Sequence, residues 1–545
     1  MGKKKFILIC VVFITHFSFS QSSNKATLAR PKLIIGLVVD QMRWDFLYRY
    51  DNLYAAGGFK RLVSQGFSCE NTMIPYVPTY TAPGHASIYT GSIPAIHGIA
   101  GNNWFEKSIN KNVYCTDDST VVAVGSNSVA GKMSPRNLFT TTIADELRLS
   151  NNFKSKVIGI SLKDRGAILP AGHSANAAYW FDAKEGQWIT SSYYMNALPE
   201  WLNSFNDKNL PDVYMSKDWN TLLPISKYDL STTDDKEYER AIGGEKSVTF
   251  PHKLPQITTF KYDAFAYTPF SNTYTFDLAK EVIENEKLGN NNVTDFLAVS
   301  ISGTDYIGHS FGPNSVETQD AYLRLDIDIA EFLKFLDNKI GKNNYLLFLS
   351  ADHGVAHVPS FLKEHNTPAE VYSSSALATG INELVEAKFG IKNSVQTVVN
   401  YQVYLNTIKI EKENKSSEEI KQAVIKYLKE KPFVIDAFET SKIAQTSVPE
   451  PIKSMLINGY NTKRSGDIEF LARPQYFDWT PKGTSHGSWN PYDAHIPLVW
   501  FGWNIKQGKT NRETYMTDIA PTIASMLRIQ MPNGSIGKVI EEVMK

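Results

Sequence analysis

Five continuous apolar runs constrain the fold of this chain more than any other feature of its sequence. They occupy residues 32–39, 155–162, 293–302, 345–350 and 496–501. Each is long enough for a strand that is buried on both faces, and such strands are typical of parallel sheets covered by helices. Helical apolar spacing lies between the runs, most clearly over residues 420–428. The alternation predicts an α/β fold with an open, mostly parallel sheet flanked by helices on both faces.

Two long segments interrupt this alternation. Residues 171–290 are rich in aromatic, asparagine and serine residues, and residues 360–480 hold one clear helix among charged loops. We interpret both as insertions that cap the core, so that residues 21–545 form one domain.

The first twenty residues have the pattern of a secretory signal peptide. Lys3, Lys4 and Lys5 precede the apolar run 6–13, and small and polar residues follow it. We expect cleavage near Ser20 and a periplasmic or secreted protein. The alternative is a buried N-terminal strand or helix.

Charge and cysteine content narrow the choice of partners. The chain has 56 basic residues, counted as lysine plus arginine, and 56 acidic residues, counted as aspartate plus glutamate. It therefore lacks the excess of basic residues that is typical of proteins that bind duplex nucleic acid. No later run is apolar for about 18 residues, so no membrane span is expected. Cys69 and Cys115 remain after cleavage, and in an oxidising compartment we expect them to form one disulfide. The alternative is two buried free thiols.

Carboxylates and imidazoles follow or flank the apolar runs. In open α/β sheets, ligands bind beyond the carboxyl ends of the strands. Asp305 and His309 are four residues apart, which places them on one side of a helical turn. Any one of these residues alone is more simply read as a hydrogen-bonded loop residue. Together, three aspartates and three histidines suit two divalent metals, zinc foremost: Asp40, Asp305, His309, Asp352, His353 and His486.

The segment 78–91 is dense in hydroxyl groups. Thr81 precedes Ala82 and Pro83, where a helix can begin. The simpler interpretation is that Thr81 caps this helix. The alternative is a nucleophile, activated by a neighbouring metal ion and placed where a helix N-terminus attracts an anion.

These segments resemble the alkaline phosphatase superfamily. Its nucleophile region is matched by Thr81-Ala-Pro-Gly-His85, Thr90-Gly91, His97-Gly98-Ile99 and Asn102. Its metal motifs are matched, in the expected chain order, by Asp305-Tyr-Ile-Gly-His309, Asp352-His353-Gly354 and His486-Gly487. The threonine branch of this superfamily contains nucleotide pyrophosphatase/phosphodiesterases and the bacterial phosphate-irrepressible alkaline phosphatases.

The resemblance implies a role for each matched residue. Asp305, His309 and His486 would hold the zinc that binds the leaving-group oxygen. A second zinc, which also contacts the Thr81 oxygen, would be held by Asp40, Asp352 and His353. Asn102 would donate a hydrogen bond to a phosphoryl oxygen.

Lys163 and Arg165 distinguish the branches. If the chain stays extended, the two side chains share a face and can grip a phosphoryl dianion. A monoester offers that extra charge and a diester does not. The pair resembles the phosphate-irrepressible alkaline phosphatases, whereas the alternative is two surface cations paired with Asp164.

The resemblance therefore implies a secreted, zinc-dependent phosphomonoesterase. It would act through a covalent phosphothreonine on a broad range of small phosphate esters, with residues 21–545 as a single catalytic domain. A nucleotide pyrophosphatase/phosphodiesterase is the main alternative. A sulfatase is disfavoured because no Cys-x-Pro-x-Arg segment is present, and a non-catalytic binding protein is disfavoured because no ligand or nucleophile is lost. The oligomeric state stays open, with a monomer favoured.

Overall fold

The computed structural model describes residue 2 and residues 29–544 of the chain, so the expected signal peptide lies, apart from Gly2, outside the described residues. Four of the predicted strands form the parallel centre of one large sheet. In spatial order they are β10 (Tyr345–Ser350), β1 (Leu33–Val39), β9 (Asp295–Ile301) and β6 (Val157–Ser161). All four are buried along their whole length. The predicted open, mostly parallel sheet is confirmed.

The fifth apolar run joins this sheet in the opposite direction. It forms β18 (Leu498–Gly502), which pairs antiparallel with β10 and not parallel as the run suggested. An apolar run looks the same in either direction, so the sequence could not distinguish the two. Beyond β18, the sheet continues through β2 (Phe67–Met73), which also pairs with β17 (His495–Ile496) and β19 (Gly508–Tyr515).

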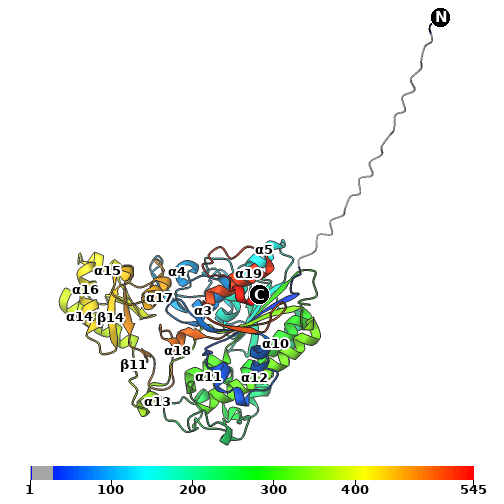
Figure 1. The fold of residues 1–545 in the computed structure, drawn as a ribbon. Helices are drawn as coiled ribbons and strands as arrows, with labels where there is room; N and C mark the ends of the chain where they lie inside the picture. The colour runs from blue at the N-terminus through cyan, green and yellow to red at the C-terminus, as the bar shows by residue number, and fades with distance from the viewer. Residues whose placement is uncertain (1, 3–28, 545) are drawn as a thin grey trace.

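Helices cover both faces of the sheet (Figure 1). One layer contains α10 (Phe270–Asn285), α11 (Gly303–Phe311) and α12 (Val316–Leu336). The opposite layer contains α3 (Thr81–Thr90), α5 (Ile143–Ser150), α6 (Asp164–Ala171) and α19 (Ile519–Leu527). The carboxyl ends of the central strands therefore open between two helical layers, where loops can bring polar side chains together.

Part of the segment 171–290 belongs to the core and not to an insertion. It contributes β7 (Ala177–Asp182), parallel to β6, and β8 (Gln187–Ser191), antiparallel to β7, as well as α10. Only the stretch between β8 and α10 leaves the sheet, with the short helices α7 (Glu200–Asn206), α8 (Leu210–Met215) and α9 (Lys261–Ala266). Several of the aromatic residues that marked the segment as unusual are buried in the core, Trp180, Trp188 and Trp219 among them.

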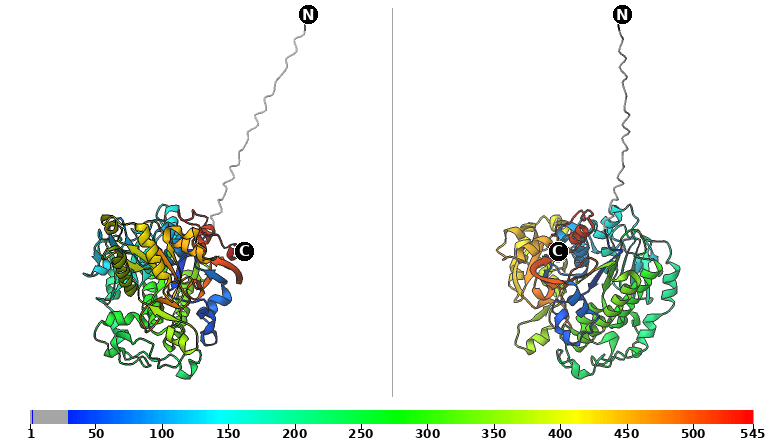
Figure 2. Two further views of the ribbon diagram at one scale, coloured as in Figure 1. Left: turned by 90° about the vertical axis from the view of Figure 1, so that its left-hand side faces the viewer. Right: turned by 45° about the vertical axis from the view of Figure 1, so that its right-hand side comes forward.

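Residues 360–480, which we call the cap, contain a small sheet of their own. Its strand order is β12 (Val395–Val399), β13 (Gln402–Leu405), β15 (Ile468–Ala472) and β14 (Val434–Glu439). Helices α14 (Ser374–Phe389) and α16 (Ser417–Lys429) pack on this sheet around a separate hydrophobic core. The cap stands to one side of the main sheet (Figures 1 and 2).

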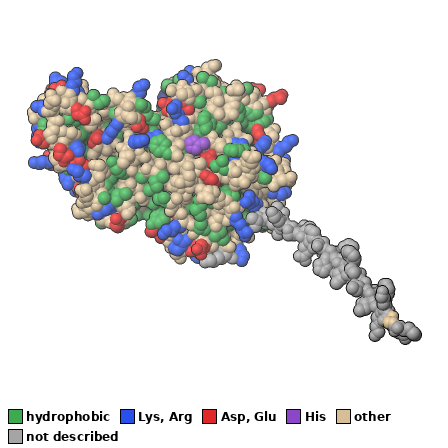
Figure 3. All heavy atoms as spheres, turned by 90° about the horizontal axis from the view of Figure 1, so that it is seen from above, with side chains coloured by type: hydrophobic (Ala, Val, Ile, Leu, Met, Phe, Trp, Pro, Cys, Tyr) green, Lys and Arg blue, Asp and Glu red, His purple; other side chains and the backbone are tan. Residues whose placement is uncertain are grey.

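Surface charge and helix hydropathy bear on the kinds of partner that the chain can bind. On the face shown in Figure 3, acidic and basic side chains are interspersed. None of the helices in the described part of the chain has the length and hydropathy of a membrane span.

Cys69 and Cys115 are buried free thiols in two different packing clusters, so the expected disulfide is wrong. Burial raises the pKa of each thiol to about 12, which keeps both protonated.

Candidate active site

The six predicted metal ligands lie in two adjoining groups. In the first, Asp305 Oδ1 lies 3.2 Å from His309 Nε2 and 3.8 Å from His486 Nε2. In the second, His353 Nε2 lies 3.5 Å from both Asp40 Oδ1 and Asp352 Oδ2. The two groups touch because the rings of His353 and His486 stack at 3.6 Å.

The topology explains why the groups meet. Asp40 follows β1 and Asp352 follows β10, so both lie at the carboxyl edge of the parallel strands. Asp305 and His309 lie one helical turn apart on α11, which follows β9. His486 precedes β17 and β18, and because β18 is antiparallel, its amino end lies at that same edge. The reversed strand thus delivers the last imidazole to the site.

Each of the three imidazoles is held in one orientation by a backbone carbonyl. The Nδ1 atoms of His309, His353 and His486 lie 2.8, 2.9 and 2.8 Å from the carbonyl oxygens of Thr484, Gly354 and Thr79, respectively. A carbonyl can only accept, so each Nδ1 carries the proton and donates it, and each Nε2 presents a lone pair toward the carboxylates. This orientation is typical of histidine metal ligands.

Electrostatics keeps two of these rings neutral. Burial lowers the pKa of His353, against the opposing effect of Asp352. Burial, together with repulsion from His353 and His309, holds the pKa of His486 well below its ordinary value. A neutral imidazole is the form that binds a metal.

Buried carboxylate oxygens complete the donor set. Asp40 Oδ1 and Asp352 Oδ2 are fully buried and accept no hydrogen bond. Burial, with repulsion from Asp305 and Asp352, holds the pKa of Asp40 well above its ordinary value. Buried carboxylate oxygens without a hydrogen bond, beside neutral imidazoles, are the environment that a divalent cation would stabilise. The residues therefore fit a divalent-metal centre, and two compact sets of three could hold an ion: Asp305, His353 and His486, and Asp40, Asp352 and His353.

Lys163 adopts a position that the sequence did not predict. Its Nζ lies 2.7 Å from Asp40 Oδ2 and 2.5 Å from Asp305 Oδ2, so it bridges one carboxylate from each group. The side chain is 3% exposed. Burial alone would lower the pKa of Lys163, but Asp305 and Asp40 raise it above its ordinary value. The lysine is therefore a buried cation of the site and not one of a pair of surface charges.

Arg165 reaches the site from a helix and not from extended chain. Lys163 is the N-cap of α6 and Arg165 lies in the first turn, so the expected extended geometry does not occur. The Arg165 guanidinium donates to Tyr114 Oη at 2.9 Å, and Tyr114 donates to Asp164 at 2.7 Å. Its Nε is buried without a partner, which leaves a donor available.

Thr81 is the first residue of α3, and its hydroxyl does not cap the helix. The N-cap is Tyr80, and no side chain caps this end. Thr81 is 1% exposed, and its Oγ1 lies 3.4 Å from His353 Nε2. Asn102 accepts a hydrogen bond from Ala82 N at 2.9 Å through Oδ1, so its amide nitrogen is the group left to donate. The hydroxyl, the amide and the helix N-terminus converge on one place.

Two further residues support the site: His85, which belongs to the matched nucleophile motif, and Gln41, which the sequence analysis missed. His85 lies 3.3 Å from Asp352 Oδ2 through Nδ1, and its Nε2 lies 2.8 Å from Ser300 Oγ. Gln41 donates from Nε2 to Asp305 Oδ1 at 2.7 Å, in the left-handed region at φ 66°. A left-handed non-glycine residue directly after Asp40 marks a functional turn, but that signal needs the backbone.

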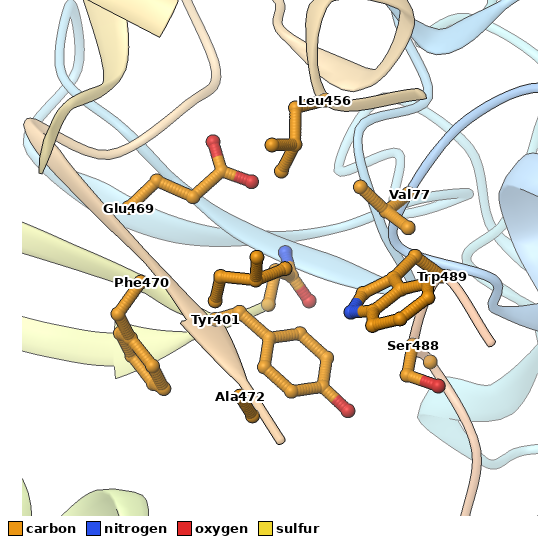
Figure 4. Close-up of a pocket in the computed structure, with 11 residues that line it drawn as sticks. Val77, Tyr401, Leu456, Glu469, Phe470, Ala472, Ser488 and Trp489 are labelled. Carbon is orange, nitrogen blue, oxygen red and sulfur yellow. The ribbon is translucent and has the colours of Figure 1, made fainter. Parts of the chain in front are cut away.

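A narrow cavity lies where the cap meets the segment after His486 (Figure 4). Tyr401 and Glu469 come from the cap, and Trp489 comes from the core. Glu469 is 4% exposed, and burial raises its pKa to about 8 despite a hydrogen bond from Gln402. The cavity lies between the cap and the segment that follows His486, a predicted metal ligand. None of the six predicted ligands lines it.

Comparison with known proteins finds similarity along nearly the whole chain. The family model for type I phosphodiesterase/nucleotide pyrophosphatase matches residues 34–493. A Myroides odoratus protein named calcium-transporting ATPase is 53% identical, covering 97% of each chain. Alkaline phosphatase PhoV of Synechococcus elongatus is 48% identical, covering 99% of this chain and 100% of its own. The crystal structure of alkaline phosphatase PafA matches with a TM-score of 0.93 at 49% identity, covering 95% of this chain and 100% of that one.

Proposed function

Since this chain belongs to the type I phosphodiesterase/nucleotide pyrophosphatase family, within the alkaline phosphatase superfamily, we propose that it is an alkaline phosphatase that hydrolyses phosphomonoesters at Thr81. Full-length similarity to alkaline phosphatases supports the reaction class. The observation that carries the choice of monoesters is the pair of cations, Lys163 and Arg165, at the carboxyl edge of the sheet.

The site would hold two zinc ions. Asp305, His309 and His486 would hold one, and Asp40, Asp352 and His353 would hold the other. Bound zinc would supply Lewis-acid stabilisation of charge on the phosphoryl and leaving-group oxygens. The neutral imidazoles and the unpaired oxygens of Asp40 and Asp352 support this assignment.

The residues of the chain itself would carry the covalent chemistry. Thr81 Oγ1 attacks phosphorus, a new P–O bond forms, and the bond to the leaving oxygen breaks. The threonine proton passes to solvent water, and solvent water returns one proton to the leaving alkoxide, which departs as the alcohol. Water then attacks the phosphothreonine, releasing inorganic phosphate and restoring the hydroxyl. Asn102 and the N-terminus of α3 would stabilise the equatorial oxygens throughout.

Charge favours a monoester over a diester. A phosphomonoester presents a dianion, whereas a diester has exchanged one charged oxygen for a second organic group. Lys163 and Arg165 can compensate that extra charge, Arg165 with a planar guanidinium and Lys163 as a point charge. A nucleotide pyrophosphatase/phosphodiesterase remains the alternative, because the family model carries that name.

A phosphate-release assay tests this choice. An aryl phosphomonoester and the corresponding aryl methyl diester are compared on the wild type, on T81A and on the double variant K163A/R165A. We expect the wild type to prefer the monoester, T81A to lose both activities, and the double variant to lose monoester hydrolysis far more than diester hydrolysis. Equal losses on both substrates would favour the diesterase alternative.

The same proposal covers compartment and partners. The basic residues and the apolar run at the start of the chain support export to the periplasm or medium. The partners would be small phosphate esters from a broad range. Mass spectrometry of the secreted protein would test the expected cleavage near Ser20.

A further inference from the structure

Arg240 is fixed beside the candidate site by backbone pairing. Its N–H donates to the carbonyl of Ser310, the residue after His309, at 3.0 Å. Two residues earlier, the carbonyl of Tyr238 accepts from Gly483 N at 2.8 Å. The segment 238–240 is thus held between the end of α11 and the loop that leads to His486. Both neighbours carry a predicted metal ligand.

An aromatic ring connects Arg240 to the first ligand group. The Arg240 guanidinium lies 5.2 Å from the Trp479 ring centroid, within cation–π range. Trp479 in turn stacks on His309 with centroids 4.8 Å apart and planes 18° apart. Guanidinium, indole and imidazole therefore form a stack, and its outermost member is a permanent positive charge.

Among the residues that the structure describes, no anionic side chain contacts this guanidinium. Within residues 29–544, no carboxylate or carbonyl is in hydrogen-bond or ion-pair contact with it. The neighbouring Glu239 does not neutralise it at neutral pH, because burial and repulsion from Glu317 raise the pKa of Glu239 to about 10. The indole Nε1 of Trp479 is also buried without a partner. Two neighbouring side chains thus have donors without an acceptor among the described residues.

Arg240 and Lys163 both lie near a pair of tyrosines, Tyr267 and Tyr306. Both cations act on Tyr267: burial raises the pKa of Tyr267, as does Asp305, while Arg240 and Lys163 oppose the rise. The Tyr267 ring lies 5.0 Å from Tyr306, over which Lys163 Nζ lies at 5.1 Å. Lys163 contacts Asp40 and Asp305 directly, whereas Arg240 is connected to His309 through Trp479.

We propose that Arg240, with Trp479 Nε1–H as a second donor, binds an anionic group on the leaving group. The inference rests on the proposed function, in which Asp305, His309 and His486 face the leaving-group oxygen. The preferred substrates are then phosphomonoesters whose leaving group carries a carboxylate or a second phosphate. A guanidinium matches either anion, and the partly exposed position of Arg240 leaves room for groups of different size.

The test uses two substrates that differ only in charge. Phenyl phosphates with a meta or para carboxylate are compared with the matching carboxamides, with kcat/KM measured for the wild type and for R240A, R240K and W479F. We expect R240A to lower kcat/KM about tenfold for the carboxylates, the scale of one charge-assisted hydrogen bond, and to leave the carboxamides within about twofold. R240K should retain part of the preference, and W479F, which lacks the indole donor, should lose a smaller part of it.

Controls separate this inference from the proposed function. K509A removes an exposed positive charge on β19 and should not change the carboxylate preference. If the wild type hydrolyses neither substrate, the proposed function fails and the inference with it. If it hydrolyses both, equal losses in R240A would show that Arg240 only supports His309 and would overturn this inference alone. An unchanged preference in R240A would overturn it as well.

Discussion

Removal of the Lys163 ammonium should destabilise the protein much more without metal than with it. Lys163 Nζ bridges Asp40 and Asp305 at 2.7 and 2.5 Å, with all three side chains no more than 4% exposed. Asp352 adds a third buried carboxylate. Without bound cations, this lysine is therefore in direct contact with two of the three acids.

The size of the effect follows from this geometry. One ion pair at 2.7 Å is worth about 6 kcal/mol at an effective dielectric constant of 20, but desolvation cancels part of that gain. Breaking such a buried pair costs about 3–5 kcal/mol, because an uncompensated charge is left behind. Two bound divalent cations would more than offset three carboxylates, so K163A should then lower the free energy of unfolding by less than about 1 kcal/mol.

Urea unfolding of wild type and K163A, with EDTA or with excess zinc, measures this difference. The destabilisation by K163A should be at least about 2 kcal/mol larger in EDTA. K156A is a matched control, because Lys156 is 37% exposed and pairs with Glu286 at 3.0 Å; its effect should stay below about 1 kcal/mol in both solutions. Equal destabilisation by K163A in EDTA and in zinc would refute the view that the lysine offsets the charge of an unfilled metal site.

Three shorter predictions concern the nucleophile, the metals and the cap. T81A should lower kcat at least about a thousandfold, while T81S keeps a hydroxyl and should retain measurable turnover and a covalent phosphoenzyme detectable by mass spectrometry after acid quench. EDTA should abolish phosphate release, and zinc should restore it; activity that survives exhaustive chelation would contradict the metal assignment. Glu469 binds its proton more tightly in the folded state, with a pKa of about 8 against an ordinary value of 4.5. Unfolding therefore releases a proton between these pH values, and the stability of the wild type should fall relative to E469Q, by at most about 5 kcal/mol from pH 4 to 9; parallel urea midpoints would contradict this.

The sequence predicted the central strands and one helical turn, because each of these depends on residues that are close together in the chain. Burial on both faces leaves only apolar residues in a central strand, so β1, β9 and β10 were visible as unbroken runs. The four-residue spacing of Asp305 and His309 predicted one helical turn, and α11 supplies it. Aromatic composition misled the interpretation of residues 171–290, because core aromatics and loop aromatics look alike in sequence.

The remaining errors concern distant contacts. The positions of Lys163 and Arg165 depend on where β6 ends and α6 begins, and the sequence places that boundary only within a few residues. The partners of Cys69 and Cys115 are set by packing in two separate clusters. The direction of β18 depends on its pairing with β10, which no residue of the run itself encodes.

The reversed strand β18 also sets the order in which the site can be completed during synthesis. His486 lies just before β17 and β18 near the end of the chain, whereas Asp40 and Thr81 leave the ribosome first. A nascent or truncated chain that stops before residue 486 can assemble at most the group formed by Asp40, Asp352 and His353. The complete set of predicted ligands can therefore assemble only after nearly the whole polypeptide has been translated.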